Sequence, residues 1–166
     1  FLEHKMFDVE GAENAMMTLS GRGASANAFT STDMTAYHFE STDMFSENLE
    51  LLLKFVSTPY FTQESVEKER GIIAQEIKMV EDDPDTAVYY GLLRCLYRED
   101  PVRDPVAGTV ESIQDIDSQV LYMCHRAFYT PSNMVLVVVG DQDPARVRET
   151  AVEVLPDYNA PAAERD

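Results

Sequence analysis

The sequence predicts an α+β fold in which an antiparallel sheet is covered by helices. Apolar residues recur three and four positions apart over several segments, which is the spacing of one face of a helix. Two neighbouring segments instead alternate apolar and polar residues on either side of a short polar turn, as the strands of a hairpin do. Because strands and helices do not alternate regularly along the chain, the pattern does not favour a parallel sheet.

The first elements are two short helices, a hairpin and a third helix. Residues 25–32 and 34–41 form the two strands, joined by a Ser-Thr-Asp turn. The helix that follows is capped by Asp43 or Ser46 and ends before Pro59. Its apolar residues at helical spacing are Leu49, Leu52, Leu53 and Val56.

A long helix comes next. It starts at Thr62 and continues to the acidic stop before Pro84. Two further helices, over residues 86–97 and 118–129, are separated by an irregular stretch that contains two prolines and ends at Gly108.

Residues 134–139, with the sequence Met-Val-Leu-Val-Val-Val, are apolar on both faces and predict a central strand. A last helix begins at Pro144 and ends near Pro156. Three strands are few for a sheet that so many helices cover, so we expect N-terminal strands from sequence ahead of Phe1. The predicted domain therefore comprises residues 1–156, and residues 157–166 form a linker.

Composition and charge limit the classes of partner. The chain has 166 residues, of which 45% are hydrophobic, as expected of one globular domain with a core. Its formal net charge of −17 repels phosphate and anionic lipid, which excludes nucleic acid and membrane as favoured partners. No apolar run has the roughly 18 residues that a membrane span needs. We expect a cytoplasmic localisation.

The sequence offers one place where a histidine and several carboxylates can converge. Glu3 and His4 lie in the first helix, while Glu69 and Glu76 are two turns apart on one face of the long helix. Glu76 lies among apolar residues, where a buried carboxylate would need a cation. The alternative is a boundary position from which its side chain reaches water. His38 lies between two aromatic residues on the predicted second strand, and His125 lies on a predicted helix with Tyr122 and Phe128 nearby, so we expect both to be packed or surface residues and not metal ligands.

Five segments, in order, resemble the inverzincin metallopeptidases, the superfamily of pitrilysin, insulin-degrading enzyme and mitochondrial processing peptidase. The sequence Phe-Leu-Glu-His at residues 1–4 is similar to the end of the zinc motif His-x-x-Glu-His. The other four segments are residues 23–31, 67–76, 101–113 and 129–134. The likeness extends to about residue 156 and is strongest to bacterial members. It implies a metalloprotease domain of the processing-peptidase type.

The resemblance also implies roles for single residues. His4 and Glu76 would be ligands of Zn²⁺, Glu3 the general base and Glu69 a supporting catalytic carboxylate. The chemistry is consistent, because catalytic zinc sites use three histidine or carboxylate ligands and leave one position open.

A substrate peptide would pair as an added strand with the backbone of Asn27, Ala28 and Phe29. On its own, Asn27 can also be interpreted as a polar residue at a strand end that bonds its own turn.

One departure from the motif is important. The first histidine would immediately precede Phe1 and is absent from the sequence. We therefore expect this chain to be inactive and to bind zinc weakly or not at all, whereas the full-length protein is a zinc-dependent endopeptidase that hydrolyses peptides or unfolded segments. The alternative is a non-catalytic substrate-binding or scaffold subunit of a two-subunit peptidase. The expected partners are a peptide substrate and the missing C-terminal half or a homologous subunit.

Overall fold

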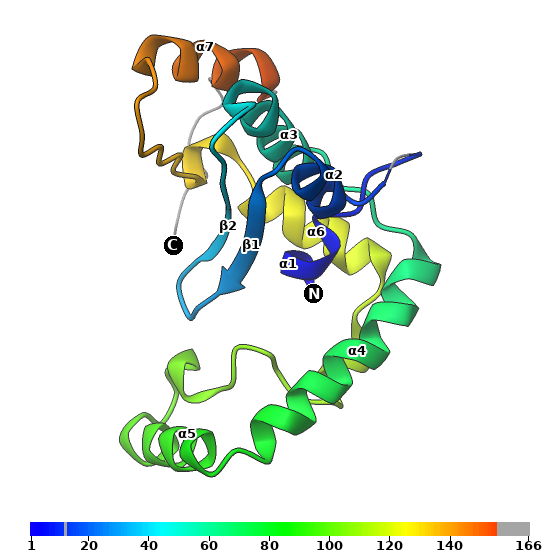
Figure 1. Cartoon of the computed structure of the whole chain (residues 1–166). Coiled ribbons are helices and arrows are strands. Elements are labelled where there is room, and N and C mark those ends of the chain that lie inside the picture. The colour runs from blue at the N-terminus through cyan, green and yellow to red at the C-terminus, as the bar shows by residue number, and fades with distance from the viewer. Residues whose placement is uncertain (12, 156–166) are drawn as a thin grey trace.

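The computed structural model describes residues 1–11 and 13–155 and confirms the α+β class, with helices grouped around an antiparallel hairpin (Figure 1). Among these residues, the α-helices are α1 (Leu2–Lys5), α2 (Ala15–Gly21), α3 (Phe45–Ser57), α4 (Gln63–Glu81), α5 (Pro84–Leu96), α6 (Ser118–Phe128) and α7 (Pro144–Val154). The strands are β1 (Ser25–Thr30) and β2 (Thr35–Glu40), and three short 3₁₀ helices are Pro101–Arg103, Ser112–Asp115 and Pro131–Asn133.

The predicted hairpin is present, and its register decides which residues face the core. Ala26 pairs with Phe39, Ala28 with Tyr37, and Thr30 with Thr35. These residues share one face of the hairpin because side chains alternate along a strand. Except for the two threonines, they pack on the main core, which α1, α2, α3 and α6 complete. The hairpin is thereby fixed beside α1.

The long helix α4 begins where the sequence predicts, because the Thr62 hydroxyl accepts a hydrogen bond from the Ser65 N–H at 3.1 Å. Its first turns pack on the main core through Val66. Ile73 and Ile77 then pack on Ile113 of the second 3₁₀ helix. Beyond that point α4 leads away from the hairpin towards α5, which has no buried residue (Figure 1).

The prediction of a central strand at residues 134–139 is wrong for the part of the chain that the structure describes. The segment forms no strand, and Val135, Val137 and Val139 are 88%, 74% and 94% exposed. A strand requires a neighbour that accepts and donates backbone hydrogen bonds. The hairpin does not pair with this segment, so its valine side chains stay exposed.

The start of α3 and the C-terminal segment differ from what the sequence predicts or lie outside the described residues. The cap of α3 is neither Asp43 nor Ser46 but Met44, which adopts a left-handed conformation with φ of 53° and makes no side-chain cap. The predicted linker, residues 157–166, lies outside the described residues. None of the described helices is both long and apolar enough to cross a membrane.

His125 of α6 gives a predicted pH dependence of stability. Its Nε2–H donates to the Val56 carbonyl at 2.9 Å, and its ring stacks on Tyr129. Burial lowers the pKa of His125, and the bond to Val56 opposes this effect. In the unfolded chain the pKa returns to about 6.5, so the unfolded state binds more protons as the pH falls past that value. The free energy of unfolding is therefore expected to decrease as the pH falls below about 6.5.

Urea unfolding of the full-length protein at a series of pH values measures this contribution. The His125→Gln variant is expected to show a flatter dependence than the wild type in this range, because its amide does not titrate. A variant with the same slope as the wild type would contradict the assignment to His125.

Candidate functional site

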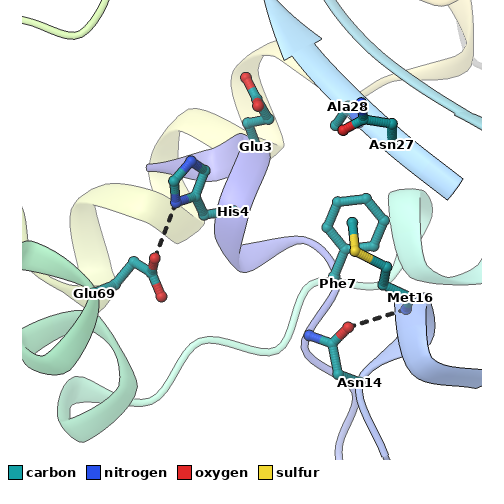
Figure 2. Close-up of a pocket in the computed structure, with 8 residues that line it drawn as sticks. All are labelled: Glu3, His4, Phe7, Asn14, Met16, Asn27, Ala28 and Glu69. Atoms are coloured by element: carbon teal, nitrogen blue, oxygen red, sulfur yellow. Dashed lines mark hydrogen bonds and ion pairs between the residues drawn. The ribbon is translucent and has the colours of Figure 1, made fainter. Parts of the chain in front are cut away.

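The structure places His4 between the two glutamates of α4. Its Nδ1 lies 2.9 Å from Glu69 Oε1, and its Nε2 lies 3.7 Å from Glu76 Oε2. Helix α1 supplies the histidine, and the seven-residue spacing on α4 puts both carboxylates on the face that meets it. Figure 2 shows His4 directed from α1 towards Glu69 of α4. Three of the sequence-predicted site residues are thus brought together.

The hydrogen bond to Glu69 fixes the tautomer of His4. A carboxylate oxygen only accepts hydrogen bonds, so the proton of the neutral imidazole lies on Nδ1. Nε2 then carries a free lone pair, and this atom faces Glu76. An imidazole held by a carboxylate at one nitrogen is the usual arrangement of a histidine that binds a metal through the other.

Glu76 occupies the boundary position that the sequence left as an alternative. Its side chain is 49% exposed, so burial does not force a cation onto it. Its importance follows from its distance to His4 Nε2, not from its apolar neighbours in sequence.

Lys5 is a site residue that was not predicted from the sequence. This lysine is buried, forms an ion pair with Asp8, and has its Nζ 3.7 Å from Glu69 Oε2. Glu69 therefore lies between a cation and the His4 ring, which keeps its carboxylate directed towards α1. No spacing in the sequence indicates the contact of Lys5 with Glu69, because the two residues are far apart in the chain.

Glu3 lies on the same short helix, one residue before His4, and is directed towards the hairpin (Figure 2). Its Oε2 accepts a hydrogen bond from the Thr30 hydroxyl at the end of β1. Glu3 and His4 line a cleft of about 290 Å³ together with Glu69, Asn27 and Ala28. The cleft also contacts Phe7, Asn14 and Met16.

The predicted substrate-binding residues are placed only partly as expected. Asn27 and Ala28 line the cleft, whereas Phe29 is 50% exposed and does not line it. The Ala28 N–H donates to the Asn27 side-chain oxygen at 2.9 Å, so Asn27 bonds the adjacent backbone within β1 and not a turn at a strand end. A peptide that binds to this N–H would have to displace that oxygen.

Tyr37 of β2 and Tyr129, the residue that follows α6, form a pair of buried phenols. Their hydroxyls are 2.8 Å apart, and Thr35 lies near the hydroxyl of Tyr129. Burial raises the pKa of both tyrosines above their ordinary values. Both phenols are therefore neutral near pH 7 and able to donate.

The donor atoms at the site are of the types that bind zinc, but they are fewer than a catalytic zinc site requires. An imidazole nitrogen and a carboxylate oxygen are ordinary zinc ligands, and a second carboxylate orients the ring. A catalytic zinc site has three protein ligands, however, and the described residues contain no cluster of three groups that could hold a metal ion.

Comparisons with known proteins give the family. The model described as Insulinase (Peptidase family M16) matches residues 1–110, and the model described as Peptidase M16 inactive domain matches residues 115–165. The chain is 51% identical over 147 residues to a Bacillus subtilis protein named uncharacterized zinc protease YmfH, covering 89% of this chain and 34% of that protein. It is 33% identical over 147 residues to uncharacterized zinc protease ML0855 of Mycobacterium leprae, covering 86% of this chain and 33% of the relative.

A solved structure agrees. The crystal structure of an M16-like peptidase from Alicyclobacillus acidocaldarius superposes with a TM-score of 0.86 and 42% sequence identity, covering 99% of this chain and 38% of that one. The chain thus spans about a third of the length of the curated relatives it matches. The matched family model, the zinc protease relatives and the shared fold together show that the chain belongs to the insulinase family of peptidases, peptidase family M16.

Proposed function

We propose that the full-length protein containing this chain is a zinc-dependent endopeptidase that hydrolyses peptides or unfolded segments. The observation that carries the proposal is the position of the His4 ring, whose nitrogens face Glu69 and Glu76 while Glu3 lines the adjoining cleft. The names of the relatives, which are called zinc proteases, support the same chemistry.

In this proposal His4 and Glu76 hold the metal, and Glu3 moves the proton. When bound, zinc would polarise the peptide carbonyl and make water acidic enough to react near neutral pH. Glu3 takes a proton from the attacking water as the water oxygen bonds to the carbonyl carbon. The same carboxyl then gives the proton to the amine nitrogen as the C–N bond breaks. Glu69 and Lys5 keep the His4 ring in the required tautomer and orientation.

The substrate is proposed to bind along β1. This strand pairs with β2 on one edge, and its other edge has no strand partner among residues 1–11 and 13–155. An extended peptide could add there through main-chain hydrogen bonds at Asn27, Ala28 and Phe29. Backbone hydrogen bonds depend little on the side chains of the peptide, so peptides of many sequences would be cleaved.

We also propose a third ligand for the metal and a second half of the protein that covers the cleft. A histidine directly before Phe1 would complete the metal site, as the resemblance to the zinc motif implies. The remaining part of the full-length protein, or a homologous subunit, would cover the cleft, which is consistent with a chain that covers 38% of its structural relative. The cytoplasmic localisation stays a prediction.

The chain as given is expected to retain little zinc. Loss of a residue that only orients a ligand lowers metal affinity by about 10 to 100-fold, and loss of a ligand costs more. Metal analysis after loading with zinc and dialysis should give much less than one zinc per chain. One zinc per chain after dialysis would contradict this expectation.

A cleavage assay tests the proposed activity. The full-length protein should cleave a fluorogenic peptide, lose the activity with a chelator and regain it with added zinc. If no chelator-sensitive cleavage is observed while the protein still binds unfolded peptide, the alternative role of a non-catalytic substrate-binding or scaffold subunit is favoured.

A further inference from the structure

Glu3 lies at one end of a row of four hydroxyl groups that crosses the hairpin. The Thr30 hydroxyl donates to Glu3, and Thr30 Oγ1 lies 3.3 Å from Thr35 Oγ1. The Tyr129 hydroxyl lies near Thr35 and 2.8 Å from the hydroxyl of Tyr37. The row therefore connects α1, both strands and the end of α6.

The carboxylate gives this row a direction. Thr30 has one hydroxyl proton, and it is used in the bond to Glu3 because an ionised carboxylate only accepts. Thr35 must then donate to Thr30. Both threonine hydroxyls donate towards Glu3, and aligned hydrogen bonds of this kind polarise and strengthen one another.

The far end of the row is fixed in the core. The Tyr37 ring packs edge-on against Phe7 and Phe55, with ring centroids 5.8 and 6.0 Å apart. Tyr129 packs on the buried His125 ring at 4.7 Å. At the near end, α1 is fixed through the contacts of His4 and Lys5 with Glu69, whereas the Glu3 side chain is directed away from them to the hairpin (Figure 2). The Thr30 hydroxyl thus holds a long and flexible carboxylate against β1.

We propose that Thr30 is a positioning residue that holds the Glu3 carboxylate in its reactive orientation, and that Thr35 supports Thr30. The proposal rests on the proposed role of Glu3 as general base. Correct placement of a reacting group accounts for a large part of enzymatic rate, and displacements near 1 Å can cost about 100-fold.

A pair of substitutions in the full-length protein isolates the hydroxyl. Thr30→Val removes it but keeps the shape, and valine favours a strand, so the hairpin should fold. We expect kcat to fall by about 10 to 100-fold with little change in KM or in zinc content. Thr30→Ser restores the hydroxyl and should recover most of the loss. Thr35→Val, one hydrogen bond further away, should cause a smaller decrease.

A matched control is Thr150→Val on α7, whose hydroxyl bonds only within its own helix to the Arg146 carbonyl. This variant should have the kcat of the wild type. If Thr30→Val keeps the wild-type kcat while Glu3→Gln is inactive, the positioning role is wrong although the proposed function holds. If Thr30→Ser loses as much activity as Thr30→Val, the hydroxyl is not the cause and the proposal is also wrong.

Crystal structures give a readout that does not need activity. In Thr30→Val the Glu3 side chain should leave its wild-type position or occupy several rotamers, whereas in Thr30→Ser it should stay. A single unchanged Glu3 conformer in Thr30→Val overturns the proposal even if the protein has no peptidase activity. An active Glu3→Gln variant would instead refute the proposed role of Glu3 itself.

Discussion

Glu3→Gln in the full-length protein is expected to lower kcat by about 10² to 10⁴-fold, the range that general acid–base catalysis contributes. Glutamine has nearly the same shape and can still accept a hydrogen bond from Thr30, but it cannot take a proton from water. Zinc content should stay the same, because Glu3 is not placed as a ligand. The measurement is steady-state cleavage of a peptide together with metal analysis.

Glu10→Gln is the matched control for that experiment. Glu10 is exposed and lies outside the cleft, so the same change of charge there should leave kcat unaffected. If Glu3→Gln and Glu10→Gln have equal activity, Glu3 is not the general base and the proposed chemistry is refuted.

Glu76→Gln is expected to weaken zinc binding by more than about 100-fold, since the loss of a ligand exceeds the cost of losing a group that only orients one. The substitution removes the anionic oxygen that lies 3.7 Å from His4 Nε2 and leaves the length of the side chain unchanged. Because the side chain is half exposed, the fold should tolerate it. Competition with a chromogenic chelator measures the affinity.

The control for Glu76 lies on the same helix. Glu81 is exposed at the last turn of α4, and Glu81→Gln should retain wild-type zinc affinity. Equal affinities of the Glu76→Gln, Glu81→Gln and wild-type proteins would show that Glu76 is not a ligand. Peptidase activity should decrease together with zinc affinity in the Glu76→Gln variant and should stay unchanged in the Glu81→Gln variant.

Much of the site could be predicted from the sequence because it depends on local geometry. The spacing of Glu69 and Glu76 puts them on one face of α4 wherever that helix lies. The sequence of residues 1–4 and 67–76 then indicated which histidine they meet. Lys5 and Thr30 could not be found in this way, because their importance comes from contacts with Glu69 and Glu3 that the packing of α1 creates.

The Val-rich segment at residues 134–139 shows the opposite case. Its composition indicates a strand, but a strand forms only where another backbone supplies hydrogen bonds, and the described residues do not supply one. The pattern of residues indicates which secondary structure a segment can form. Whether the segment forms it depends on the backbone that lies next to it.

The sequence by itself therefore predicted the helices and the hairpin, since these follow from periodicity and capping, and its resemblance to the zinc-motif family indicated the histidine and carboxylates of the proposed site. Only the tertiary structure decided which nitrogen of His4 faces which glutamate, how far Glu76 is exposed and what holds Glu3. The physical reason is that these properties depend on distances between side chains far apart in the chain, and packing sets those distances.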